Sequence, residues 1–370
     1  MKEDNDIFKK FRDSFSKIDG HFHILEQRVP VERQMEYFKY SEKIRKDQDK
    51  PDISKMDFSV FEDSLDDPES TVEHKKYVLS MLATSRQVKA YRILEEYAQA
   101  LDPDVADWAY MALMESRIAL ESELSDEKQI YISTGLGGKG EKLRFYVLIL
   151  ANELKPFLEY QKKVIEREFP YSLEKAGCEI ERLTIGEKYM ELVFLIPVRA
   201  DIKQALDKVI NECNQYGNFL SQVFTITNVK ELSAEEVEEI IKRMEETVKQ
   251  AIKYGIVGVS NTVITAVVIW IMMKLFGCSD VVSNMVGYVA GVLNSFIWNK
   301  QWTFRSSAGW IGSAVRFGVV FGVCYLLQLG LLVYVLNPYL SIDPYYNQLI
   351  AMAFYTVINF IMNKFYTFKA

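Results

Sequence analysis

Charged residues are scarce in the last third of this 370-residue chain. Residues 254–370 hold six basic and two acidic residues, a net charge of +4, whereas the whole chain carries −7, which leaves −11 on residues 1–253. The low charge of the last third predicts a membrane-embedded region. The strongly acidic remainder argues against nucleic acid as a partner.

Cysteine and histidine are too few and too scattered to suggest catalysis or metal binding. The four cysteines form no CxxC pair, and His21, His23 and His74 lack the spacing of a zinc site. We therefore expect no catalytic residue, no metal, no cofactor and no enzymatic activity. No apolar leader follows Met1, so the front part is expected to stay in the cytosol.

One polar and aromatic motif occurs twice in the last third. It reads Phe296-Ile-Trp-Asn-Lys-Gln-Trp-Thr-Phe304 and, 64 residues later, Phe360-Ile-Met-Asn-Lys-Phe-Tyr-Thr-Phe368. We call these the first and second Asn-Lys motifs. A further pair, Lys253-Tyr-Gly255 and Arg316-Phe-Gly318, lies 63 residues apart. Whole units are therefore repeated, and each is predicted to hold two membrane spans.

Four stretches have the length of roughly 20 mostly apolar residues that a helix needs to cross a membrane. They cover residues 255–276, 281–298, 317–336 and 349–365. Basic residues gather on the side of the Asn-Lys motifs, which the positive-inside rule makes cytoplasmic; they are Lys249, Lys253, Lys300, Arg305, Arg316, Lys364 and Lys369. We predict a four-helix membrane domain over residues 254–370, made of two parallel two-span repeats, with both termini cytosolic.

Small and amide residues lie within these spans. Two small-xxx-small faces, for which close helix packing is expected, consist of Gly287, Gly291, Gly318 and Gly322. Amides need hydrogen-bond partners in hydrocarbon; those present are Asn261, Asn284, Asn294, Asn299, Gln328, Asn359 and Asn363. Taken singly, the lysines and aromatic rings of the motifs are explained by anchoring at the membrane interface.

At these residues the chain resembles the GtrA-like family of small bacterial membrane proteins. The family opens its first and third spans on an aromatic residue near glycine, like Tyr254-Gly-Ile-Val-Gly258 and Phe317-Gly-Val-Val-Phe-Gly322 here. It closes the second and fourth spans on Asn-Phe-x-x-Asn-Arg, like Asn294-Ser-Phe-Ile-Trp-Asn-Lys300 and Asn359-Phe-Ile-Met-Asn-Lys364. The resemblance covers about residues 250–370. Lysine in place of arginine keeps the charge but loses a bidentate fork for phosphate.

The resemblance implies a translocase for polyprenyl-phosphate-linked sugar in cell-surface polysaccharide synthesis. Such a protein would lie in the bacterial inner membrane and contact membrane lipids. The two-span units are too small for an obvious large cavity, which suggests a homo-oligomer. Candidate contacts for the lipid phosphate are Lys300, Lys364, Arg316, Asn299 and Asn363. Candidates along the path of the headgroup are Asn261, Asn294, Asn359 and Gln328. The alternative is a membrane-anchored regulatory or scaffold protein that recruits a cytosolic partner, such as a glycosyltransferase, without transport.

The soluble part is long enough for two modules. Residues 1–64 are expected to be a partly flexible helical segment, and residues 65–125 a HEAT-like repeat or a simple bundle, with Pro68 and Pro103 near helix starts. Residues 126–232 have a βαββαβ pattern, which predicts a ferredoxin-like α+β fold. Residues 233–253 are predicted to form a connecting helix that opens with a capping box at Ser233.

The segment Gly135-Leu-Gly-Gly-Lys-Gly140 matches the G-x-G-x-x-G formula of dinucleotide-binding loops. Such a loop must open a helix, whereas the strand pattern of residues 142–151 follows here. The segment is therefore predicted to be a hairpin or linker rather than a phosphate-binding loop.

Overall fold

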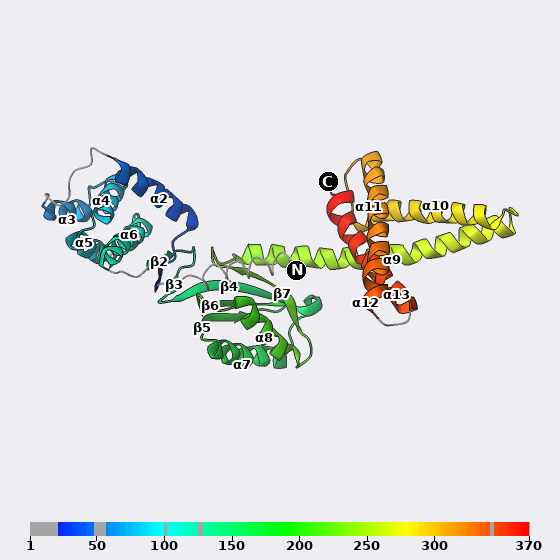
Figure 1. The fold of residues 1–370 in the computed structure, drawn as a ribbon, viewed down its shortest axis with the longest axis horizontal. Coiled ribbons are helices and arrows are strands. Elements are labelled where there is room, and N and C mark those ends of the chain that lie inside the picture. The colour runs from blue at the N-terminus through cyan, green and yellow to red at the C-terminus, as the bar shows by residue number, and fades with distance from the viewer. Residues whose placement is uncertain (1–20, 48–56, 100–101, 125–128, 341–343, 370) are drawn as a thin grey trace. The chain divides into compact units, whose positions relative to one another are not determined.

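The computed structural model describes residues 21–47, 57–99, 102–124, 129–340 and 344–369. The chain divides into two compact units, Met1–Val237 and Glu238–Ala370. Figure 1 shows the helices and strands of each. The flexibility expected within residues 1–64 concerns in part residues 1–20 and 48–56, which lie outside the described residues.

The first unit begins with helices that share one apolar core. These helices are α2 (Val31–Lys46), α3 (Ser59–Asp66), α4 (Val72–Thr84), α5 (Val88–Gln99) and α6 (Ala106–Leu124). Tyr37 on α2 and Phe61 on α3 share the core with Leu79 on α4. The division expected at residue 64 therefore does not separate two cores.

Two short strands, β1 (His21–Ile24) and β2 (Gln129–Ile132), pair in parallel on either side of these helices in the sequence. The described part of residues 1–64 therefore contains a strand in addition to helices of the kind expected there. The strand was not predicted because β1 is only four residues long, which is too short for a clear alternating pattern. Its partner β2 also lies far along the chain.

A curled antiparallel sheet follows in the first unit. Its strands are β3 (Gly138–Lys139), β4 (Lys142–Ala151), β5 (Glu179–Ile185), β6 (Tyr189–Pro197) and β7 (Leu220–Thr227). The main order is β7-β4-β6-β5, and β3 pairs with the start of β4. Helices α7 (Glu159–Lys175) and α8 (Ile202–Asn214) cover one face (Figure 1). The elements from β4 to β7 follow one another in the βαββαβ order that the sequence predicts.

Alternate residues of the central strand β4 bury their side chains beneath the two helices. Phe145, Val147 and Ile149 belong to the same core as Phe169 of α7 and Leu206 of α8. This spacing of two is the period of a strand with one face toward helices. The long apolar strand predicted over residues 142–151 is confirmed.

The glycine-rich segment includes a hairpin and packs closely against the backbone of other segments. β3 forms the hairpin with the start of β4. A Cβ at Gly135 would collide with the carbonyl group of Val229, and one at Gly137 would lie 2.5 Å from the carbonyl oxygen of Gln27. Gly137 also has φ of +67°, which glycine adopts most easily. The hairpin prediction is confirmed, and the glycines are explained by close backbone contact.

The rest of the chain consists of helices α9 (Ala234–Lys274), α10 (Asp280–Trp298), α11 (Trp310–Leu331), α12 (Asn337–Tyr339) and α13 (Pro344–Met362). Among the described residues, four helices are long and apolar enough to cross a membrane: Ala234–Lys274, Asp280–Thr303, Trp310–Tyr339 and Tyr346–Thr367. The prediction of four membrane-capable helices is confirmed.

Two helix starts show how local contacts decide the boundaries. Before α9, the predicted capping box is present, because Glu236 N–H donates to Ser233 Oγ at 3.3 Å and Ser233 N–H to Glu236 Oε2 at 2.9 Å. α11 begins at Trp310 rather than at the expected residue 317. Arg316 lies within this helix, where its Nε donates to the carbonyl oxygen of Gly312 at 3.3 Å.

Both Asn-Lys motifs end in one π-helical turn, over Asn299–Thr303 and Asn363–Thr367. The N–H groups of Phe304 and Phe368 each donate at 2.9 Å to the carbonyl oxygen of the motif asparagine. Single π-helical turns of this kind are frequent at functional sites. The two motifs therefore have the same local backbone structure.

Candidate functional site

Six aromatic rings from the motifs and span openings pack together in what we call the aromatic cluster; they are Tyr254, Phe296, Phe304, Phe317, Phe360 and Phe368. Its contacts occur in matched pairs. Phe296 lies 5.5 Å from Phe317 between ring centroids, and Phe360 lies 5.4 Å from Tyr254. Phe296 lies 6.0 Å from Phe368, and Phe360 lies 5.9 Å from Phe304.

The centre of the aromatic cluster is the contact between the last rings of the two motifs. Phe304 and Phe368 are stacked with centroids 5.2 Å apart. Phe296 and Phe368 are buried. The explanation of these rings as an interface belt is therefore insufficient, since they join the first and second halves of the domain.

Basic side chains tie each span opening to a motif. Lys253 Nζ donates to the carbonyl oxygen of Trp302 at 3.3 Å. At the corresponding place in the second half, Arg316 Nη1 donates to the carbonyl oxygen of Tyr366 at 3.2 Å. The two halves thus repeat this contact as well.

The motif lysines instead reach into the opposite half. Lys300 Nζ donates to the carbonyl oxygen of Ala308 and, at 3.3 Å, to Ser313 Oγ on α11. Lys364 Nζ donates to Thr247 Oγ1 on α9 at 2.6 Å. Lys300 is 3% exposed, whereas Lys364 is half-buried. All these acceptors are neutral oxygens, so none of these hydrogen bonds pairs an ammonium group with a carboxylate.

The motif asparagines are buried and only partly satisfied. Asn299 Nδ2 donates to Ser295 Oγ at 3.2 Å, and Asn363 Nδ2 donates to Asn359 Oδ1 at 2.6 Å. Among the described residues, the Oδ1 atoms of Asn299 and Asn363 have no hydrogen-bond partner. A buried acceptor without a partner costs about 1–3 kcal/mol. A ligand hydroxyl that reached one would therefore be stabilising.

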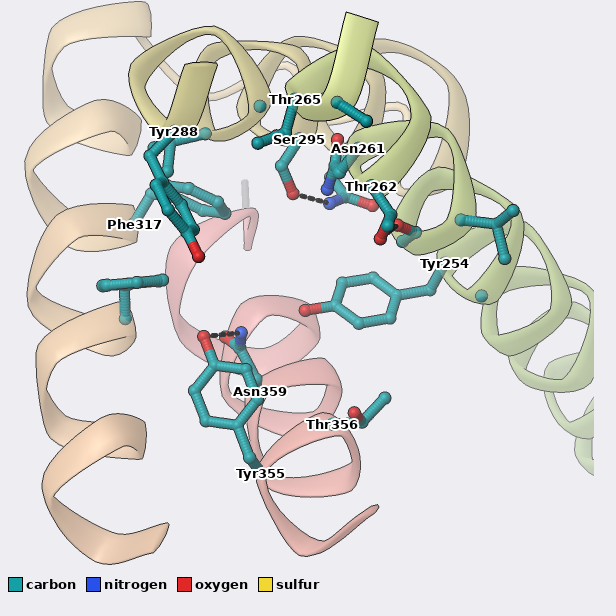
Figure 2. Close-up of a pocket in the computed structure, with 18 of the residues that line it drawn as sticks. Tyr254, Asn261, Thr262, Thr265, Tyr288, Ser295, Phe317, Tyr355, Thr356 and Asn359 are labelled. Atoms are coloured by element: carbon teal, nitrogen blue, oxygen red, sulfur yellow. Dashed lines mark hydrogen bonds between the residues drawn. The ribbon is translucent and has the colours of Figure 1, made fainter. Parts of the chain in front are cut away.

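A cavity of about 750 Å³ lies among α9, α10, α11 and α13 (Figure 2). Amides, hydroxyls and aromatic rings make up much of its wall, and every residue that lines it is uncharged. Tyr254 and Phe317 belong both to this wall and to the aromatic cluster. The cluster therefore borders the cavity on the side of the Asn-Lys motifs.

The structure brings together three of the four residues predicted along the headgroup path. Asn261 and Asn359 line the cavity, and Asn294 Nδ2 donates to Asn261 Oδ1 at 2.7 Å. Gln328 lies outside the lining. Of the residues predicted to contact phosphate, Asn299 lines the cavity.

The predicted packing glycines fall into two groups. A Cβ at Gly287 would lie 2.5 Å from Ile269 Cγ1, and one at Gly291 would collide with Thr265 Oγ1, so both allow α10 to approach α9. A Cβ at Gly318 or Gly322 would meet no described atom within 4 Å. The packing expected at these two glycines is therefore not made within the described chain.

Sequence reasoning missed several polar groups near the site. Tyr355 lines the cavity, and its hydroxyl accepts a hydrogen bond from Asn359 Nδ2 at 3.0 Å. A tyrosine within a span gives no special signal. Thr303 and Thr367 are buried, and the Oγ1 atom of each is unpaired within the described structure. These threonines occupy the same position in both motifs, so the repeat could have identified them as candidate site residues.

Comparison with known proteins agrees with this geometry. The family model of the GtrA/DPMS transmembrane domain matches residues 253–368. A relative, the uncharacterized membrane protein YngA of Bacillus subtilis (strain 168), is 31% identical over 96 residues, which cover 23% of this chain and 63% of the relative. The match thus spans less than two thirds of that protein. The predicted resemblance is confirmed, because residues 253–368 match the GtrA/DPMS transmembrane domain.

Proposed function

We propose that this protein moves a polyprenyl-phosphate-linked sugar from the cytoplasmic to the outer leaflet of the bacterial inner membrane. The observation that carries the proposal is the uncharged, hydrogen-bonding cavity among the four membrane helices. A sugar that crosses hydrocarbon must exchange its water for protein donors and acceptors. Amides and hydroxyls such as Asn261, Thr262 and Asn359 supply such groups within the span region.

The lipid phosphate is assigned to the side of the Asn-Lys motifs. Lys300, Lys364 and Arg316 bond only to neutral oxygens in the contacts described above. An anionic phosphate would compensate such charges better than a carbonyl or hydroxyl does. Lys364 and Arg316 are the more accessible contacts, because Lys300 is almost fully buried.

The domain is proposed to consist of two parallel repeats, which the matched aromatic contacts support. Both Asn-Lys motifs and both termini are then cytosolic. We further propose a homo-oligomer, and a cytosolic protein as the partner of the soluble part, which is taken to have no enzymatic activity of its own. The ferredoxin-like description of residues 126–232 belongs to the same proposal, supported by the strand order β7-β4-β6-β5.

The test compares two glycine substitutions in proteoliposomes. Gly258 lines the cavity and Gly318 does not, yet a Cβ at either would meet no described atom within 4 Å. Gly258→Phe is expected to slow leaflet-resolved transfer of polyprenyl-phosphate-linked sugar by about tenfold or more, which corresponds to about 1.4 kcal/mol in the barrier. Gly318→Phe, the matched control, is expected to stay near the unsubstituted rate.

Equal slowing by both substitutions would disconnect the cavity from transport. Transfer of none of a broad panel by the folded, unsubstituted protein would favour the scaffold alternative instead. In that case, capture of a glycosyltransferase by the acidic soluble part becomes the function to measure.

A further inference from the structure

We infer that strand β7 of the soluble part pairs in antiparallel fashion with β7 of a second copy of this chain. The inference gives the homo-oligomer proposed above a contact surface outside the membrane domain. It does not depend on what the membrane domain transports.

β7 lies at one edge of the sheet. It pairs with β4, and in the order β7-β4-β6-β5 no strand among the described residues lies on its other side. An edge strand presents backbone N–H and C=O groups that can pair with another chain. The open side of β7 is therefore a candidate contact surface.

The hydrogen bonds of β4 show which groups of β7 are open. Ala151 N–H donates at 2.8 Å to the carbonyl oxygen of Lys188, beside β6. Successive residues of a strand direct their backbone groups to opposite sides, so the even-numbered residues of β4 direct theirs toward β7. Leu148 is one of these, and it lies opposite Thr225. The backbone groups of Thr225 therefore face β4.

The residues on either side of Thr225, Phe224 and Ile226, direct their backbone groups away from β4. This arrangement is self-complementary. In an antiparallel pair centred on Thr225, Phe224 of one copy lies opposite Ile226 of the second copy. The two copies then exchange four backbone hydrogen bonds across a two-fold axis.

The start of β7 is already occupied by side chains. Leu220 N–H donates to Asn214 Oδ1 at 2.8 Å, and Asn214 Nδ2 donates to the carbonyl oxygen of Leu220 at 2.8 Å. Val223 N–H donates to Ser221 Oγ at 3.1 Å. The open stretch is thus the one around Thr225, which fixes the register of the pairing.

The side chains of the open residues favour the same arrangement. Phe224 and Ile226 are partly buried against the core beneath α7 and α8. In the proposed pair each phenylalanine would lie beside an isoleucine of the other copy on this face. Aromatic and β-branched side chains stabilise a sheet when they lie opposite each other on neighbouring strands.

The two edge strands of the sheet differ in charge. β5 carries Glu179, Glu181 and Arg182, whereas β7 holds no charged residue and no proline. Charged side chains and proline are the usual protection of an edge strand against pairing. Two copies of β7 therefore meet without repulsion between like charges. Anchoring by the four apolar helices also holds a second copy in the same membrane, which raises its local concentration.

The test is disulfide formation in the full-length protein in membrane vesicles. The background is Cys278→Ser, because the other three cysteines are buried. In the proposed pair the two Thr225 Cα atoms lie about 4.5 Å apart, within the reach of a disulfide. Val223→Cys, also at an exposed position, is the matched control, since two such residues would lie roughly 13 Å apart along the paired strands.

We expect Thr225→Cys to give at least about fivefold more disulfide-linked dimer than Val223→Cys. Equal yields would overturn the inference. A disulfide from Thr225→Cys to a different protein, with no homodimer, would also overturn it and assign the edge to another partner. Neither result bears on the proposed transport, which is measured separately by leaflet-resolved transfer.

A second substitution separates strand pairing from mere proximity. Ile226→Pro removes an N–H group that faces away from β4, a place where an edge strand tolerates proline. Added to Thr225→Cys, it should lower the yield of dimer at least about fivefold, whereas Ile226→Val, which keeps the N–H group, should not. An unchanged yield from the folded proline variant would overturn the pairing. The comparison of Thr225→Cys with Val223→Cys does not depend on the folding of this variant.

Discussion

The two Asn-Lys motifs have the same sequence pattern, the same π-helical turn and matching aromatic contacts, but their lysines differ. Lys300 is buried because the chain folds back after its motif. This places the carbonyl oxygen of Ala308 and the hydroxyl of Ser313 within hydrogen-bond distance of Lys300 Nζ. Lys364 is half-buried, and its hydrogen bond described above goes to Thr247 Oγ1. The comparison shows that the rings are held by contacts between the halves, whereas each motif asparagine bonds to a side chain four residues earlier on its own helix. Both lysines reach side chains of another helix, and they differ in how deeply they are buried there.

The largest expected effect concerns the side of the membrane on which the motifs lie. Cys278 is the accessible native cysteine of the described chain, since Cys178, Cys213 and Cys324 are buried. Burial also raises the pKa of Cys178 to about 11 and of Cys213 to about 12, which keeps these thiols protonated and unreactive. A membrane-impermeant maleimide added to intact cells should label Cys278.

The same reagent should not label thiols beside either motif in intact cells. In a Cys278→Ser background, Ser307→Cys and Lys369→Cys place exposed thiols beside the first and second motifs. Each is expected to react only after the membrane is permeabilised. Labelling of one but not the other in intact cells would put the motifs on opposite sides and break the comparison.

The next effect tests the shared aromatic cluster. Phe368→Ala should destabilise the membrane domain by about 3 kcal/mol, because a buried phenylalanine leaves a cavity. Phe304→Ala should cost somewhat less, since Phe304 is half-buried. Unfolding in detergent micelles measures both, with exposed Phe365→Ala as the control. A control as destabilising as Phe368→Ala would mean that the cluster has no special role.

The lysines should then separate the two motifs. Lys300→Met removes a buried ammonium together with its hydrogen bonds. We expect it to lower the free energy of unfolding by about 2 kcal/mol. Lys364→Met removes a half-buried ammonium and its hydrogen bond to Thr247. We expect it to lower the free energy of unfolding by about 1 kcal/mol. Unfolding midpoints in the same detergent decide the order. The reverse order would show that the exposure of these lysines does not determine how much stability each substitution costs.

The smallest effect concerns the two equivalent basic residues at the span openings. Lys253→Gln and Arg316→Gln each remove a bond to a motif carbonyl, and each should cost under about 1 kcal/mol because the groups are partly exposed. The two values should agree within the error of the same unfolding assay. A clear difference would show that this contact is not equivalent in the two halves.

Much of the membrane domain was predictable because its signals are local. The motif repeat, the four apolar stretches and the small faces all follow from spacing along the chain. The acceptors of Lys300 were not predictable in the same way, because they depend on how the chain folds back after the first motif. The bond from Asn359 to Tyr355 is different, because it joins residues four apart on α13. Asn299 was predicted to hold phosphate by its place before lysine, yet the structure puts it in the wall of the cavity.

The soluble part shows the same limit. The strand over residues 142–151 and the capping box at Ser233 were read directly from local pattern. The pairing of β1 with β2 was not, since parallel partners are distant in sequence. Gly135 was identified as part of a formal motif, but the carbonyl of Val229 that explains it comes from the other end of the sheet domain.

The uncharged wall of the cavity has an electrical consequence. A wall without charged groups carries no charge of its own through the membrane field. On the proposed route, the phosphate of the lipid is then the charge that crosses, and 100 mV acts on one elementary charge with about 2.3 kcal/mol. Because the cytoplasmic side of a bacterial membrane is negative, the membrane potential itself would favour movement of the anionic headgroup toward the outer leaflet.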